Sequence, residues 1–125
     1  MYNNKLTLKD RLLEIMESIK LIQEWSNNRH STDDYMLSPD GVMAFNACVM
    51  RLQVIGEHVG KLLKDEGKPL ENFKQIPWLA IYDLRNIISH EYANIDEELI
   101  VSIINDDIPK LKNVVEEMQK LLWKE

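Results

Sequence analysis

Hydrophobic residues recur along most of the chain at intervals of three and four, the period of a helix with one buried face. One such stripe covers residues 8–22 and follows a possible Thr7 cap with Asp10 three places on. We expect this first helix to end near Asn27–Asn28. No sustained alternation and no Asn-Gly or Asp-Gly turn indicates a strand.

The same period predicts the later elements. Residues 29–37 are polar and indicate a loop, after which Ser38-Pro39-Asp40 is typical of a helix start, with a cap, a proline at the first position and an acid in the first turn. The second stripe runs from Phe45 to Leu63, and Gly67 is a natural stop. Three further helix starts follow, at Pro77, at Asp96-Glu97-Glu98 for a short helix through about Ile104, and at Asn105–Asp107 with Pro109 for the last helix.

Short connections between such helices favour antiparallel neighbours. We therefore predict an all-α, up-and-down bundle of four main helices with a short extra helix, forming a single domain over residues 1–125. The composition of 45 % hydrophobic and 29 % charged residues suits a soluble fold. Cys48 is the single cysteine and lies on an apolar stripe, so a buried structural thiol is expected.

The formal charge of −6 argues against sequence-independent coating of nucleic acid, which needs a broad basic surface. This net charge does not exclude a nuclease that acts through a small local cationic site. No apolar run is long enough for a membrane span, and Met1–Lys5 lack the apolar core of a secretion signal. These features predict a cytoplasmic protein with no membrane partner.

The third helix carries the residues with the clearest chemical potential. At about 100° per residue, one side is apolar, whereas Tyr82, Asp83, Arg85, Asn86, Ser89, His90 and Tyr92 form a continuous arc on the other. Arginine can grip a phosphate bidentately, and histidine exchanges protons near neutral pH. Spacing alone leaves a structural role open, in which His90 bonds Tyr82 or a carbonyl and Arg85 pairs with Asp83 or Glu57.

Other chemistries lack their residues in this sequence. His30 and His58 lie on different segments from His90, and neither a His-Glu-x-x-His nor a Glu-x-x-His motif is present, so we expect no metal site. A serine triad and a Walker-type phosphate loop are also absent. No cofactor is predicted.

The motif Arg85-x-x-x-x-His90-x-Tyr92 resembles the Arg-x-x-x-x-His-x-Tyr signature of HEPN domains, and the chain as a whole is similar to HepT toxins, the partners of MNT nucleotidyltransferase antitoxins. Three further matches occur in the family's order along nearly the whole chain: Ile55-Gly56-Glu57, Ile76-Pro77-Trp78 and Asp107-Ile108-Pro109.

The resemblance implies a helical homodimer joined through the motif-bearing face, with metal-independent endoribonuclease activity. It implies that Arg85 and His90 act at the scissile phosphate with support from Asn86. It also implies that the antitoxin attaches AMP to Tyr92, and higher assemblies with the antitoxin are open. The negative charge of the chain is not what an RNA enzyme would be expected to carry.

A dimer also makes chemical sense, because attack by a ribose 2′-oxygen needs both a base and an acid and one chain offers only His90. We expect two copies to share these roles across a two-fold axis by the third helices. Glu57 is a candidate to hold Arg85, Arg51 to border the same cleft, and Ser89 and Tyr82 to support it. The alternative function is a catalytically weak HEPN module that serves as partner and substrate of a nucleotidyltransferase.

Overall fold

The computed structural model describes residues 6–123, and every regular element in that range is helical, which confirms the predicted all-α architecture. Met1–Lys5, where we saw no secretion signal, lie outside the described residues. The elements in chain order are α1 (Leu8–Trp25), α2 (Thr32–Met36), α3 (Pro39–Leu63), α4 (Trp78–Glu91), the 3-10 turn η1 (Tyr92–Asn94), α5 (Glu97–Ser102), the π-turn η2 (Ile103–Asp107) and α6 (Ile108–Trp123).

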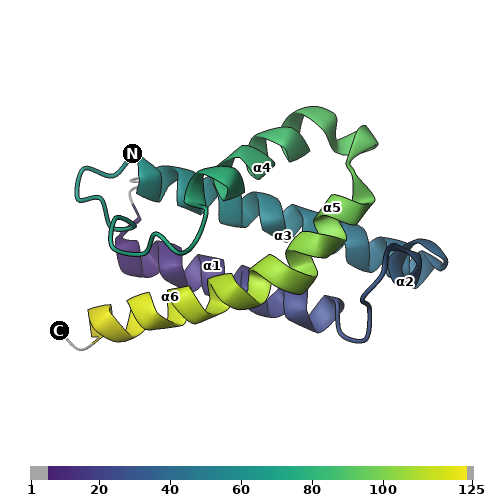
Figure 1. Cartoon of the computed structure of the whole chain (residues 1–125), viewed down its shortest axis with the longest axis horizontal. Helices are drawn as coiled ribbons and strands as arrows, with labels where there is room; N and C mark the ends of the chain where they lie inside the picture. Colours follow the sequence, from purple (N-terminus) through teal and green to yellow (C-terminus); the bar gives the residue numbers. More distant parts are fainter. Residues whose placement is uncertain (1–5, 124–125) are drawn as a thin grey trace, which may run out of the picture.

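The longest helix, α3, lies at the centre of the bundle (Figure 1). It packs against α1 along one side and against α4 along another, and α6 packs against α1. The helices α5 and α6 run on in one line across the face that α4 also borders (Figure 1). The core consists of apolar side chains from all of these helices, including Ile15, Ile19, Val49 and Val115, which have no exposed surface.

Two helix starts follow the prediction. The Thr7 side chain accepts the Asp10 N–H at 3.1 Å while the Asp10 carboxylate accepts the Thr7 N–H at 3.1 Å, so the capping box is complete. The Ser38 hydroxyl accepts the Gly41 N–H at 3.0 Å, with Pro39 at the first helical position. Both starts are local in sequence, which is why the pattern finds them.

Two helix ends come earlier than predicted. Helix α1 ends at Trp25, and Asn28 takes a positive φ of 65°, a conformation that asparagine tolerates better than most residues. Helix α3 ends at Leu63, and Gly67 lies in the following turn, where its N–H donates to Asp65 Oδ1 at 2.8 Å. Gly67 therefore shapes a loop and does not cap the helix.

The expectation of a loop over residues 29–37 is wrong in part, because residues 32–36 form α2. The Ser31 hydroxyl and the Asp34 carboxylate make a second capping box at its start. Tyr35 is buried completely, with its ring edge-on to Phe45 at a centroid distance of 5.9 Å. One aromatic anchor is enough to fix this short helix in an otherwise polar stretch.

The predicted break between the last two helices is a π-turn. The Ile108 N–H bonds to the Ile103 carbonyl, five residues back, in place of the usual four. Pro109 follows directly and has no N–H to donate, so the wider turn lets the chain pass the proline without a break. Helices α5 and α6 therefore form one continuous rod (Figure 1).

The expected burial of Cys48 is confirmed, and burial raises the pKa of its thiol to about 12. None of the helices over residues 6–123 is long and apolar enough to cross a membrane.

Candidate functional site

Helix α4 lies against α3 at very short range because two glycines face it. A Cβ at Gly56 would overlap the Arg85 Cβ and lie 3.2 Å from the Ile81 carbonyl oxygen. A Cβ at Gly60, one turn on, would overlap the Tyr82 ring. This spacing of small residues lets the side chains of α4 reach across the α3 backbone.

Arg85 is held in place by two neighbours. Its guanidinium forms an ion pair with Glu57, and Nε donates to the same Glu57 oxygen at 2.6 Å. Its Nη1 donates to Asn86 Oδ1 at 2.9 Å. The side chains of Arg85 and Glu57 are 31 % and 45 % exposed, so the ion pair is partly buried and still accessible to solvent. The expected Glu57–Arg85 contact is present, whereas the alternative pair with Asp83 is not.

His90 lies one helical turn after Asn86 on the same side of α4 and is exposed. Its imidazole makes no hydrogen bond to another described residue, so the structural alternative of a bond to Tyr82 or a carbonyl does not occur in residues 6–123. Asn86 thus contacts Arg85 directly, and the His90 imidazole one turn further on is exposed and open to a bound molecule.

A row of polar contacts joins the two helices, and we call it the α3–α4 seam. Gln53 Nε2 donates to the Ser89 hydroxyl at 3.0 Å, next to the Glu57–Arg85 pair. At the ends of the seam, the Tyr92 hydroxyl donates to Asn46 Oδ1 at 3.1 Å and Lys64 Nζ donates to the Tyr82 hydroxyl at 3.4 Å. The seam therefore brings together Tyr82, Arg85, Ser89 and Tyr92 from the predicted arc.

Two members of that arc differ from the prediction, one in its helix and one in its surroundings. Tyr92 is not on α4, because the helix ends at Glu91, and it begins η1 with its side chain 50 % exposed. Asp83 borders an apolar pocket away from the seam. The uniform polar face that the sequence suggested is thus divided between the seam, the open face with His90, and the margin of the pocket.

Arg51 does not border the site. Its Nη1 donates to the Ser18 hydroxyl at 3.5 Å, which places it against α1. Six residues separate Arg51 from Glu57, or about 240° around the helix, so the two side chains leave α3 on different sides. The expectation considered their separation along the axis and neglected this rotation.

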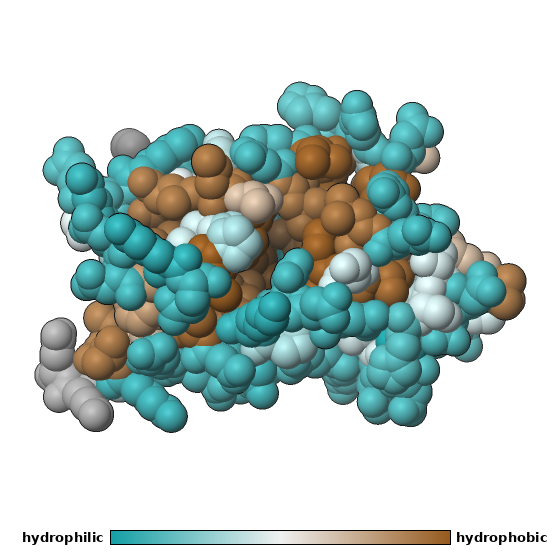
Figure 2. Space-filling model, in the orientation of Figure 1, coloured by the Kyte–Doolittle hydropathy of each residue, from teal (hydrophilic) through white to brown (hydrophobic). Residues whose placement is uncertain are grey.

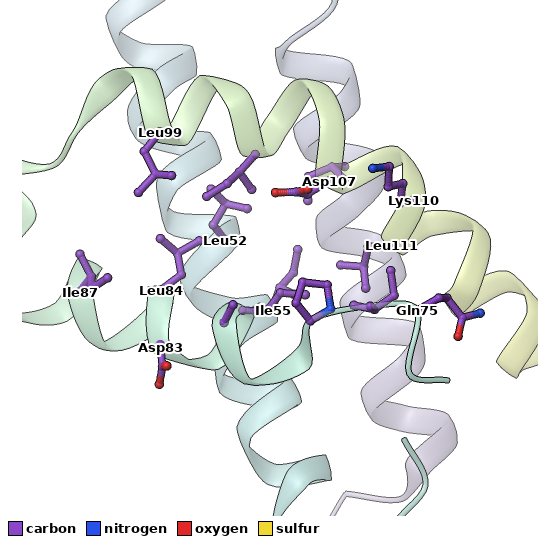
Figure 3. A pocket seen from close by; sticks show the side chains of 16 residues that line it. Leu52, Ile55, Gln75, Asp83, Leu84, Ile87, Leu99, Asp107, Lys110 and Leu111 are labelled. Carbon is purple, nitrogen blue, oxygen red and sulfur yellow. The ribbon is translucent and has the colours of Figure 1, made fainter. Parts of the chain in front are cut away.

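The apolar side of α4 faces a pocket of about 560 Å³ between α4 and the α5–α6 rod (Figure 3). Leu84 and Ile87 line it from α4, Leu99 from α5 and Leu111 from α6, over a floor from α3 that includes Leu52 (Figure 3). Hydrophobic residues gather in the middle of this face (Figure 2). Ile87 belongs to the apolar side of α4 and is nevertheless 46 % exposed.

The sequence did not single out the seam residues that α3 contributes. These residues are Asn46, Gln53, Gly60 and Lys64. Together with Glu57 they recur at intervals of seven, four, three and four, a helical stripe that is polar or small where the other stripe is apolar. This stripe could have been recognised in the sequence as the side of the helix that contacts α4.

One further histidine lies close to the site. His58 follows Glu57 and is partly buried against α1, where Arg11 Nη1 lies 3.2 Å from its Nδ1. Burial and the Arg11 charge lower the pKa of His58. No group of three or more His, Cys, Asp or Glu side chains able to hold a metal ion occurs within the described residues.

The sequence is similar to those of known proteins over most of its length. A model of the family described as ribonuclease HepT-like matches residues 12–118. A Methanocaldococcus jannaschii protein named as a candidate RNase is 31 % identical, with 90 % of this chain and 97 % of the relative covered. A Thermococcus cleftensis protein named as a probable ribonuclease HepT is 30 % identical, with 90 % and 96 % covered.

A two-part M. jannaschii protein, named as a gamma-glutamylcyclotransferase and candidate RNase, is 32 % identical over 90 % of this chain. The chain spans 50 % of the length of that relative. No solved structure shows a significant match.

Proposed function

We propose that this chain, which belongs to the HepT-like ribonuclease family, is the endoribonuclease toxin of a toxin–antitoxin pair and cleaves RNA as a homodimer without a metal ion. The observation that carries the proposal is the Glu57–Arg85–Asn86 cluster on the helix that also exposes the His90 imidazole, which has no hydrogen-bond partner within residues 6–123. A guanidinium held in place and an imidazole five residues further along the same helix are the two kinds of group that phosphodiester cleavage needs.

In the proposed reaction the ribose 2′-oxygen attacks the adjacent phosphorus, and the P–O5′ bond breaks. One imidazole accepts the 2′-hydroxyl proton and a second protonates the departing 5′-oxygen, leaving a 2′,3′-cyclic phosphate and a 5′-hydroxyl. Arg85 stabilises the negative charge that builds up on the phosphoryl oxygens. Glu57 contacts the guanidinium at Nε and Nη2 and Asn86 accepts from Nη1, which leaves the remaining N–H groups of Nη1 and Nη2 for the phosphate.

The second imidazole is the reason for a dimer. A single chain presents one His90, on an exposed face of α4. Two chains related by a two-fold axis along this face would place a second His90 and a second Arg85 at the same phosphate. The proposed dimer therefore completes the active site, because the second chain supplies catalytic side chains.

Tyr92 is the proposed site of control by an MNT-type nucleotidyltransferase antitoxin. Its half-exposed hydroxyl would attack the α-phosphorus of ATP, forming the tyrosyl–AMP bond and releasing pyrophosphate. The added group brings bulk and negative charge to one end of the seam, which would repel RNA. The hydrogen bond to Asn46 keeps the acceptor on the same face as Arg85.

A second candidate function is a catalytically weak partner and substrate of the nucleotidyltransferase. The observation that favours it is electrostatic, because Glu57 neutralises Arg85 and the whole chain has a formal charge of −6. RNA binding is then weaker than the motif alone suggests.

The test is cleavage of total RNA in EDTA by the wild-type protein beside His90→Ala and Arg85→Ala. We expect wild-type cleavage and a loss of at least about 100-fold in either variant. His30→Ala is the matched control, because it removes an exposed imidazole outside the site and should cleave normally. Full activity of His90→Ala contradicts the mechanism, and a requirement for added metal contradicts metal independence.

Modification is tested separately with the nucleotidyltransferase and ATP. Intact mass spectrometry should detect one or more adenylates on the wild type and none on Tyr92→Phe. An inactive protein that still accepts AMP at Tyr92 supports the weak-partner alternative. Light scattering on the purified protein should give the mass of a dimer.

A further inference from the structure

The end of the α3–α4 seam beyond Arg85 holds a second cation that the proposed mechanism does not use. Lys64 caps the C-terminus of α3, and its Nζ donates to the Tyr82 hydroxyl at 3.4 Å and lies 5.3 Å from the centre of the Tyr82 ring. The ring rests on Gly60, where no side chain competes for the space. The hydroxyl and the ring of Tyr82 thus both contact the exposed ammonium of Lys64 at this end of the seam.

Lys64 keeps its charge available, in contrast to Arg85. Within residues 6–123 the ion pair formed by Arg85 takes up the Glu57 carboxylate, and no carboxylate forms an ion pair with Lys64. The neighbouring Asp65 carboxylate turns to the loop, where it accepts the Gly67 N–H at 2.8 Å. The seam therefore carries a neutralised guanidinium near its middle and an unpaired ammonium at its end.

The spacing of these two cations suits one strand of nucleic acid. Tyr82 precedes Arg85 by three residues, a rise of about 4.5 Å along α4, and Lys64 follows Glu57 by seven residues, about 10.5 Å along α3. These rises separate the two cations by about 5–10 Å along the helices, so a single RNA strand could contact both of them.

We propose that Lys64, oriented by Tyr82, binds the RNA phosphate adjacent to the one that is cleaved. The inference rests on the proposed ribonuclease function and deepens it, by assigning substrate attraction to Lys64 and charge stabilisation to Arg85. It explains how an acidic chain can attract RNA while its motif arginine is held by a carboxylate. Tyr82 acts as a positioning residue for the ammonium.

The test measures binding of a short oligoribonucleotide made non-cleavable by 2′-O-methyl groups, using fluorescence anisotropy over roughly 50 to 200 mM salt. Lys64→Gln should bind roughly 10-fold more weakly at the lower salt concentration, since it loses one charge-assisted contact. It should also reduce the slope of log affinity against log salt by about 0.7, the value for one phosphate contact on a single strand. Tyr82→Phe should weaken binding by less, because the ammonium remains.

Lys120→Gln is the matched control, since it removes the same charge from α6, which packs on α1 away from the seam. It should leave both affinity and salt slope unchanged. In cleavage assays Lys64→Gln should raise KM and leave kcat near the wild-type value, a split that a damaged fold would not produce.

The outcomes separate the two proposals. If the wild type cleaves RNA and Lys64→Gln matches it in affinity and salt slope, the subsite is wrong and the ribonuclease proposal stands. If the wild type neither binds nor cleaves RNA, both are wrong.

Discussion

Gly56 is the position where one added methyl group should disturb the fold most informatively. In Gly56→Ala the new Cβ would overlap the Arg85 Cβ, and it would lie 3.3 Å from Arg85 Cγ and 3.2 Å from the Ile81 carbonyl oxygen. The Arg85 Cβ and the Ile81 carbonyl oxygen cannot rotate away, because the α4 backbone fixes both. The two helices must therefore separate locally by about 1 Å to reach normal carbon–carbon contact.

The expected magnitude combines two opposing effects. Overpacking of this kind costs roughly 1–3 kcal/mol, and alanine is about 1 kcal/mol better than glycine inside a helix. We expect a net destabilisation of about 1–2 kcal/mol, weighted to the upper half of the first range because the overlap is with rigid atoms. With a urea m-value of about 2 kcal/mol/M, the midpoint should fall by about 0.5–1 M.

Gly60→Ala provides the matched control, one turn further along the same helix. Its Cβ would overlap the Tyr82 ring, which sits at the far end of a half-exposed side chain and can rotate outward. The helix-propensity gain is the same, so the stability of Gly60→Ala should stay within about 1 kcal/mol of the wild type. Urea unfolding followed by far-UV circular dichroism compares the two variants. A Gly56→Ala protein as stable as Gly60→Ala would refute the close crossing of α3 and α4.

Three further predictions concern single groups. Glu57→Gln should change the free energy of unfolding by less than about 1 kcal/mol, as is usual for exposed ion pairs. It should reduce RNA cleavage roughly 10-fold, because the carboxylate that holds the Arg85 guanidinium is lost. Unchanged cleavage would contradict the positioning role of Glu57. Cys48, whose thiol pKa is raised to about 12, should react with a thiol reagent at pH 8 only after unfolding, and rapid labelling of the folded protein would contradict its burial. Burial and the Arg11 charge lower the pKa of His58 in the folded protein, so the unfolded chain binds a proton more readily. The free energy of unfolding should therefore fall as the pH drops below about 6.5 and level off below the pKa of the folded state. In His58→Gln this pH dependence of the free energy of unfolding should be absent.

The features that the sequence predicted correctly depend on neighbours in the chain. The caps at Thr7 and Ser38 use residues three places apart, and the apolar stripes of α1, α3 and α6 repeat within each helix. The α2 helix was missed because a single buried residue, Tyr35, anchors a stretch that is otherwise polar. One residue cannot establish a period.

The misplaced residues depend on contacts between helices. Nothing in the sequence around Tyr92 breaks a helix, since neither glycine nor proline occurs there, yet α4 ends one residue earlier and Tyr92 turns to Asn46 on α3. Arg51 is an exception, because the rotation of about 240° that separates it from Glu57 around α3 follows from helix geometry alone. The Glu57–Arg85 contact could be expected from the sequence as one of several pairings, and only the packing of the two helices selects it.

The same close contact that places Arg85 also limits what it can do alone. Bringing α4 onto Gly56 puts the guanidinium within reach of Glu57, which fixes its geometry but cancels its charge over any distance longer than the pair itself. A fixed, neutralised arginine is well suited to stabilise charge that appears on a bound phosphate and poorly suited to draw RNA from solution. Under the proposed mechanism, attraction and catalysis therefore come from different side chains, and among the described residues of the seam Lys64 is the proposed source of attraction.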